Sequence, residues 1–136
     1  MALMHPWRRW FLTLCVLASC ATQARAEGMD WAATLDAGQK AQREGKPAEA
    51  EKFFIVALKM AEAPGATGAS VADSLNNLGY FYKSRSQYDR AEPLYERLLA
   101  IQKKVMGVDH PEVATTSGIL AGMYHAQTKY DRAEPL

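Results

Sequence analysis

One heptapeptide occurs twice in this chain, because Tyr88–Leu94 and Tyr130–Leu136 both read Tyr-Asp-Arg-Ala-Glu-Pro-Leu. The offset from Tyr88 to Tyr130 defines a candidate period for the whole chain. Val71–Leu94 and the segment one period later, Val113–Leu136, share eleven identical positions. A fixed period of about 20 to 50 residues is typical of stacked repeats, in which each unit buries its apolar face against its neighbours. The sequence therefore predicts an array of repeated units.

Small residues set the register of an earlier and more divergent unit over residues 29–63. Gly38 precedes Ala50 by twelve residues, and a Gly-Ala pair recurs at the same spacing in the next unit. Apolar residues at helical spacing predict one helix over 31–43 and a second over 48–62. A short turn containing Gly and Pro joins them. Each unit is therefore expected to be an antiparallel pair of helices.

The second unit covers residues 70–107, and its second helix is predicted over 88–105. Gly79 lies inside its first helix, where a glycine costs about 1 kcal/mol relative to alanine. We expect the second helix to cross at this point, with the small residue Ala91 opposite and no side chain between the two backbones. Pro93 is expected near the opening turn of the second helix, because deeper positions do not tolerate its missing N–H.

Helix starts are marked in the second and third units. Ser70 with Asp73 three residues later is a weak capping-box signature. In the third unit, residues 108–136, His110 is expected at the helix start, with Pro111 at the first helical position.

The motifs of the second and third units resemble the tetratricopeptide repeat, and in particular the 42-residue repeats of kinesin light chains and their bacterial relatives. The resemblance covers residues 31–136 and is carried by Leu75-Asn76-Asn77-Leu78-Gly79 with Tyr82, by Tyr88-x-x-Ala91-Glu92-Pro93-Leu94-Tyr95, and by Gly107-Val108-Asp109-His110-Pro111. It implies an all-α, right-handed solenoid of stacked antiparallel helix pairs. It also implies a concave groove, lined by the first helix of each pair, that binds peptide segments of partner proteins.

The third unit departs from this pattern. Gly118 and Gly122 replace an asparagine and a tyrosine of the second unit, which is expected to lower helix stability by about 2 kcal/mol in total. The sequence given stops one or two turns into the second helix of this unit. We therefore expect a solenoid that is incomplete at its C-terminus, with Leu120, Met123 and Tyr124 partly exposed.

The groove is expected to carry polar residues of the first helices, on a stripe away from the apolar face. In the register that the resemblance gives, the candidate partner-binding residues are Asp73, Asn76, Asn77, Tyr80, Lys83, Gln39, Gln42, Arg43 and His125. Asparagine side chains offer both donors and acceptors to a peptide backbone. The alternative is that these residues are only solvent-exposed helix positions.

One specialised form of the fold clamps a C-terminal carboxylate with basic residues and asparagines from three repeats. Only Asn77 has a counterpart here, and Leu35, Thr115 and Ile119 stand where that clamp has basic residues. Binding of chaperone tails is therefore disfavoured.

The first residues have the pattern of an export signal. Arg8 and Arg9 precede an apolar run over 10–17, which is too short to span a bilayer. Two cleavage sites fit. Cleavage after Ala26 gives a signal peptide of residues 1–26, whereas a lipobox ending in Cys20 gives a lipoprotein signal of residues 1–19 with a lipid on that cysteine.

Composition disfavours several functional classes. Without residues 1–26 the chain keeps 13 basic and 15 acidic residues, so nothing favours binding of nucleic acid. Both cysteines lie in the leader, and the histidines show no metal-ligand spacing. Acidic pairs such as Glu49/Glu51 and Glu92/Glu96 are expected on solvated faces. We expect no enzyme activity, metal or cofactor.

Two functional readings follow. In the first, the protein is a bacterial scaffold exported to the periplasm or cell envelope, whose groove binds a partner protein or peptide. A lipid on Cys20 would then be its only link to the membrane. In the second, the chain is the N-terminal fragment of a longer protein and has no binding activity of its own.

Overall fold

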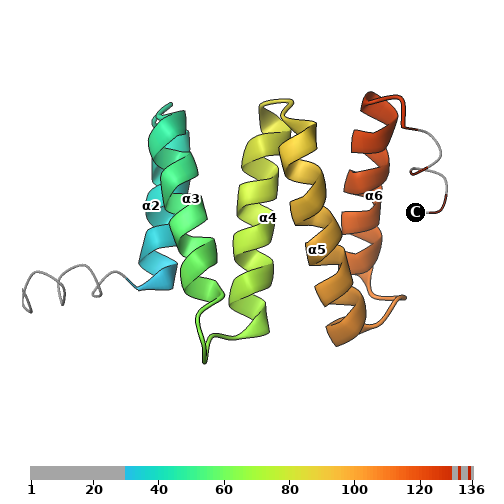
Figure 1. Ribbon diagram of the computed structural model, residues 1–136, viewed down its shortest axis with the longest axis horizontal. Coiled ribbons are helices and arrows are strands. Elements are labelled where there is room, and N and C mark those ends of the chain that lie inside the picture. Colours follow the sequence, from blue (N-terminus) through green and yellow to red (C-terminus); the bar gives the residue numbers. More distant parts are fainter. Residues whose placement is uncertain (1–29, 130–131, 133–134, 136) are drawn as a thin grey trace, which may run out of the picture.

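A computed structural model describes residues 30–129 together with residues 132 and 135. Both cleavage sites of the leader, including Cys20, lie outside the described residues. The described part contains five helices and no strand: α2 (Trp31–Arg43), α3 (Pro47–Ala61), α4 (Gly68–Ser84), α5 (Tyr88–Met106) and α6 (Pro111–Ala126). Figure 1 shows α2 with α3 and α4 with α5 as antiparallel pairs, with α6 beside α5. This arrangement confirms the all-α solenoid.

The turn that follows the first helix of each unit ends in two residues with the same backbone geometry. Lys46, Gln87 and Lys129 each donate their backbone N–H to the carbonyl five residues earlier, at 2.9, 2.9 and 2.7 Å. The residue before each of them has a positive φ, including the non-glycine Ser86 at 59° and Thr128 at 60°. A left-handed residue followed by this hydrogen bond is a common way to end an α-helix. The third unit therefore leaves its first helix in the same way as the other two.

Helix starts agree with the sequence analysis in the third unit and differ in the second. His110 caps α6, because its Nδ1 accepts a hydrogen bond from the backbone N–H of Glu112 at 3.2 Å, and Pro111 is the first helical residue. The predicted start at Ser70 was wrong. Thr67 caps α4 instead, since its hydroxyl accepts from the backbone N–H of Ser70 at 3.3 Å, so the cap lies three residues earlier.

Pro93 lies deeper in its helix than predicted. It is the sixth residue of α5, in the second turn rather than the first. The carbonyl of Asp89, four residues earlier, therefore cannot receive the usual helical hydrogen bond from position 93. The helix continues for thirteen residues beyond Pro93, to Met106, because the face of α5 that carries Tyr95, Leu98 and Leu99 is fully packed into the core.

Gly79 is required by a side chain and not by a crossing of two backbones. A Cβ at this position would lie 2.9 Å from Cε2 of Tyr95, a ring that is 1% exposed. Gly38 has the same relation to Phe54 on α3, whose ring carbons would lie 2.8 Å from a Cβ. An aromatic residue of the second helix therefore lies over a glycine of the first in both complete pairs.

The core runs continuously through all the helix pairs. Its buried members are contributed by all five helices: Leu35, Ala41, Ala50, Phe54, Ala57, Leu75, Leu78, Phe81, Tyr82, Ala91, Tyr95, Leu98, Leu99, Val113, Leu120, Met123 and Tyr124. The predicted partial exposure of the last three was wrong, because Leu120, Met123 and Tyr124 are only 1%, 1% and 3% exposed. They face α5 as part of the same cluster, and the guanidinium of Arg132 lies 4.7 Å from the ring centroid of Tyr124.

A cluster of a tyrosine, a glutamate and an arginine joins the first two units. The hydroxyl of Tyr82 on α4 and Nη2 of Arg90 on α5 both donate to Oε1 of Glu51 on α3, at 2.9 and 2.7 Å. The Arg90 guanidinium also lies 4.1 Å from the centroid of the Tyr82 ring. A carboxylate expected on a solvated face therefore bonds to residues of the next unit.

The same cluster recurs at the junction of the second and third units. The Tyr124 hydroxyl donates to Oε1 of Glu96 at 2.5 Å, and Arg132 donates to both Glu92 and Glu96. Lys129 adds a bond to Glu92 at 3.0 Å. Glu92 is only 7% exposed, so its predicted place on a solvated face was wrong. A buried carboxylate needs such partners, since an unpaired one would be costly to desolvate.

Candidate partner-binding groove

The first helices of the three units are α2, α4 and α6. The side chains of α2 and α4 are joined by two hydrogen bonds, whereas cavities lie between α4 and α6. Trp31 Nε1 donates to the Ser74 hydroxyl at 2.7 Å, and Gln39 Nε2 donates to Oδ1 of Asn77 at 3.0 Å. Polar side chains here stabilise the stacking of the first two units.

The interval between α4 and α6 holds two open cavities, which together we call the α4–α6 groove. The first, of about 280 Å³, we call the acidic pocket; it is lined by Ala72, Asp73, Asn76, Leu98, Gln102, Glu112, Thr115, Thr116 and Ile119. The second, of about 420 Å³, we call the lysine pocket; it is lined by Lys83, Tyr88, Thr115, Gly118, Ile119, Gly122 and Met123. Thr115 and Ile119 line both pockets, so the two pockets adjoin.

Two glycines help to leave the lysine pocket open. Gly118 and Gly122 are the repeat equivalents of Asn76 and Tyr80, one period later in the chain. A Cβ added at either glycine would have no atom within 4 Å. Unlike Gly79, they are not required by a neighbouring side chain. The residues that were expected only to weaken α6 therefore also remove side chains from the wall of the groove.

The structure places the candidate residues of the sequence analysis in different surroundings. Asp73 and Asn76 line the acidic pocket, and Lys83 lines the lysine pocket. Gln42 lines a smaller cavity of about 210 Å³ between the end of α2 and α4. Tyr80 is 56% exposed on α4. Their role in binding a partner stays a prediction.

Asn77 and Gln39 are engaged within the fold. Besides accepting from Gln39, Asn77 donates through Nδ2 to the carbonyl of Asp73 at 2.8 Å. Both ends of this amide therefore already have a partner. Arg43 and His125 lie exposed in the last turns of α2 and α6, outside the linings of the two pockets of the groove. Asp73, Asn76 and Lys83 are the candidate residues that the structure brings to the α4–α6 groove.

The structure also locates the three positions at which a carboxylate clamp would have basic residues. Leu35 is 9% exposed and belongs to the core. Thr115 and Ile119 line the α4–α6 groove with uncharged side chains. The groove at α6 therefore offers hydroxyl and apolar surface where the clamp has basic residues.

Sequence reasoning missed Gln102. It lies on α5, a second helix, and yet its side chain reaches the acidic pocket, where it is 7% exposed. Nε2 of Gln102 donates to Oε2 of Glu112 at 3.3 Å, whereas Oε1 of Gln102 has no hydrogen-bond partner among residues 30–129, 132 and 135. A glutamine in the middle of a helix carries no sequence signal of this kind, because its burial depends on how α6 packs against α5.

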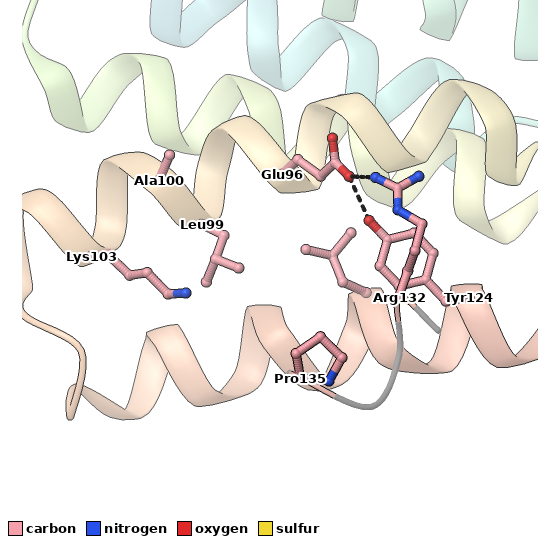
Figure 2. A pocket seen from close by; sticks show the side chains of 8 residues that line it. Glu96, Leu99, Ala100, Lys103, Tyr124, Arg132 and Pro135 are labelled. Atoms are coloured by element: carbon pink, nitrogen blue, oxygen red, sulfur yellow. Dashed lines mark hydrogen bonds and ion pairs between the residues drawn. The ribbon is translucent and has the colours of Figure 1, made fainter. Parts of the chain in front are cut away.

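A further cavity lies at the far end of the array, not in the groove. It measures about 450 Å³ and is lined by Glu96, Leu99, Ala100, Lys103, Leu120, Tyr124, Arg132 and Pro135. Figure 2 shows the dashed bonds from Glu96 to Arg132 and Tyr124 at its edge. Arg132 is the repeat equivalent of Arg90, which lies in a second helix. This cavity therefore belongs to the packing of one unit on the next.

None of the helices in the described part of the chain combines the length and the apolar character needed to cross a membrane. No group of three or more histidine, cysteine, aspartate or glutamate side chains in residues 30–129, 132 and 135 is arranged to hold a metal ion.

The paired helices, the recurring sequence register and the glycine–aromatic contacts define a helical-repeat protein of the TPR class. The model of the tetratricopeptide repeat matches residues 32–104 and again residues 70–136. The chain belongs to the tetratricopeptide repeat family. No curated protein matches the chain with significance.

Among solved structures, the chain is similar to BtubC (BKLC) from P. vanneervenii, with a TM-score of 0.67 and 26% sequence identity. The similarity covers 76% of this chain and 41% of BtubC, so this chain spans less than half the length of that protein. BtubC is a kinesin light chain-like TPR protein, which confirms that likeness for the repeats described here.

Proposed function

We propose that this protein is an exported scaffold whose α4–α6 groove binds an extended segment of a partner protein. TPR repeats in general support protein–protein interaction, and the specific assignment depends on the groove itself. The observation that carries this proposal is that two adjoining pockets with exposed polar side chains lie between α4 and α6, while α2 and α4 are joined by hydrogen bonds. Binding sites are usually such preformed concave surfaces.

The chemistry of the groove suits a peptide. Asn76 offers an amide beside the apolar side chain of Ile119. Thr115 offers an acceptor oxygen, because its hydroxyl already donates to the carbonyl of Pro111 at 3.0 Å. An extended backbone needs alternating donors and acceptors, and side chains between them need apolar surface. No feature of residues 30–129 favours the alternative of a fragment without binding activity.

Site-specific photo-cross-linking tests this function in cells that express the full chain. A benzophenone amino acid at Asn76 would lie in the groove, and the same group at Lys52, which is exposed on α3, serves as the matched control. We expect a discrete covalent adduct with one partner protein at position 76 and none at position 52. Adducts of equal yield at both positions, or none at position 76, would refute groove binding.

The export and the lipid anchor are tested separately. We propose that the leader directs the chain out of the cytoplasm, with the lipobox as the favoured cleavage site because it directly follows the apolar run. Replacing Cys20 by Ser is expected to move the protein from the membrane fraction to the soluble fraction. An unchanged distribution would instead favour cleavage after Ala26.

A further inference from the structure

The acidic pocket contains a buried hydrogen-bond acceptor without a partner. Gln102 is 7% exposed, and its Oε1 accepts no hydrogen bond from any described residue. Most buried polar atoms of native proteins are paired, so each exception needs a reason. Gln102 lines the cavity, and its shielded Oε1 is satisfied when a donor that enters the cavity reaches it.

Glu112 fixes which end of the Gln102 amide is unsatisfied. A carboxylate can only accept hydrogen bonds, so the Nε2 group of Gln102 must face Oε2 of Glu112, 3.3 Å away. Oε1 is then the atom that remains without a donor. A ligand of this pocket therefore has to supply a hydrogen-bond donor and not an acceptor.

The charges around the pocket favour a cationic donor. Asp73 and Glu112 both line it, and its lining contains no lysine, arginine or histidine. The Asp73 carboxylate forms no ion pair within residues 30–129, 132 and 135. The N-terminus of α6 contributes about half a positive charge, which two full negative charges outweigh.

We infer that the acidic pocket between α4 and α6 binds a basic side chain, lysine or arginine, of the partner segment. This inference rests on the proposed function and names the chemistry that one part of the groove selects. An ammonium or guanidinium group carries several donors and no acceptor, so it satisfies Gln102 Oε1 and pairs with Asp73 at the same time. A water molecule occupies about 30 Å³, so the cavity of about 280 Å³ has room for a long side chain.

An exposed side chain at the pocket can move to admit a donor. Oε1 of Gln102 itself is shielded from solvent. Asn76, which lines the same pocket, is exposed and can change rotamer while Glu112 keeps its bond to Gln102. Rotamer changes at an otherwise fixed backbone are common when a protein binds its partner.

Nuclear magnetic resonance tests the pocket without a known partner. The probes are N-acetyl-arginine methylamide and N-acetyl-lysine methylamide, added to the purified, isotope-labelled full-length chain. The norleucine and glutamate analogues are the apolar and acidic controls. We expect saturable shifts of the Gln102 side-chain amide and of the Thr115 and Thr116 backbone amides with at least one basic probe. The two basic probes, compared with each other, distinguish lysine from arginine.

Variants locate the interaction. Asp73→Asn is expected to weaken binding of the basic probe about fivefold, as expected for a single charge pair that is partly exposed to water. Asp36→Asn removes one negative charge from the exposed surface of α2 and is the matched control; its affinity is expected to equal that of the wild type. Gln102→Met lacks the side-chain amide, so its readout is the backbone amides of Thr115 and Thr116. Their shifts with the basic probe are expected to be lost while the chain stays folded.

The outcomes separate this inference from the proposed function. Equal shifts with the norleucine and arginine probes, or equal losses in Asp73→Asn and Asp36→Asn, would overturn the assignment of a basic side chain. A cross-linked partner at position 76 together with no response to either basic probe would keep the groove and reject this pocket chemistry. Saturable binding of the basic probe without any cross-linked partner would support the pocket and reject the scaffold function.

Discussion

The ring of Tyr95 lies over Gly79, so that its Cε2 atom would come within 2.9 Å of a Cβ at that position. The same contact joins Phe54 to Gly38 in the first unit. Each of these glycines gives up helix stability so that a large buried ring of the second helix can approach the first. Gly118 and Gly122 have no such neighbour, so substitution by alanine is expected to have opposite effects at Gly79 and at Gly118.

Gly79→Ala is expected to destabilise the protein by up to about 2 kcal/mol. Alanine improves helix propensity by about 1 kcal/mol, but overpacking of a filled core costs about 1–3 kcal/mol. The Tyr95 ring cannot move aside because it is 1% exposed. Urea unfolding followed by circular dichroism measures the change. A variant as stable as the wild type would show that the ring has room to shift.

Gly118→Ala is expected to have the opposite sign and to stabilise the protein by about 1 kcal/mol. An added Cβ meets no atom within 4 Å, and the position is exposed on α6. The same urea experiment applies, with Gly79→Ala as the comparison. If both substitutions destabilised the chain, the conclusion that a Cβ at Gly118 meets no neighbouring atom would be wrong.

Gln102→Met is expected to raise the free energy of unfolding by about 1 kcal/mol. A buried acceptor without a partner costs about 1–3 kcal/mol, and the bond that the substitution removes, to Glu112 at 3.3 Å, is a long one. Thermal and urea unfolding both measure this change. A clear loss of stability instead would mean that Oε1 is satisfied in the free protein.

Stability is expected to fall at high pH because burial raises the pKa of three tyrosines, Tyr82, Tyr95 and Tyr124. Burial, with the nearby Glu51 carboxylate as hydrogen-bond acceptor and negative charge, raises the pKa of Tyr82 from 10.0 to about 12. Burial chiefly raises the pKa of Tyr95, also to about 12. Both groups bind protons more tightly in the folded state, so their contribution is fully present below pH 10 and is lost as the pH rises towards 12.

The measurement is the urea midpoint between about pH 8 and pH 12, with the absorbance of tyrosinate recorded in parallel. In Tyr95→Phe, where one of these phenols is absent, the decline above about pH 10 is expected to be shallower than in the wild type. An identical decline in the variant would exclude Tyr95 as a source of the pH dependence.

Much of the fold is predictable from the sequence because the repeat supplies its own internal comparison. The bounds of α2 match the prediction, and His110 and Pro111 begin α6 as expected. Capping of α4 by Thr67 is harder to predict from the sequence, because several residues with hydroxyl groups lie near that helix start and only the backbone geometry selects one of them.

The groove is less predictable, because its properties depend on packing between units. Periodicity assigns Asn76 and Asn77 to the same helix face, yet Asn77 bonds to Gln39 of the neighbouring unit while Asn76 remains exposed in a pocket. Gln102 lies on a second helix, so no pattern of the first helices can include it. Residue type and spacing therefore indicate the face that binds, but not which side chains on it are available.

The recurring clusters around Glu51 and around Glu92 and Glu96 have a consequence for how such an array can grow. The second unit carries a tyrosine and an arginine that bond to the unit before it, and a glutamate that bonds to the unit after it. A duplicated unit inserted at either junction would thus bring matching bonding groups on both of its sides. The gene for such a chain can lengthen by whole repeats without leaving a buried carboxylate uncompensated.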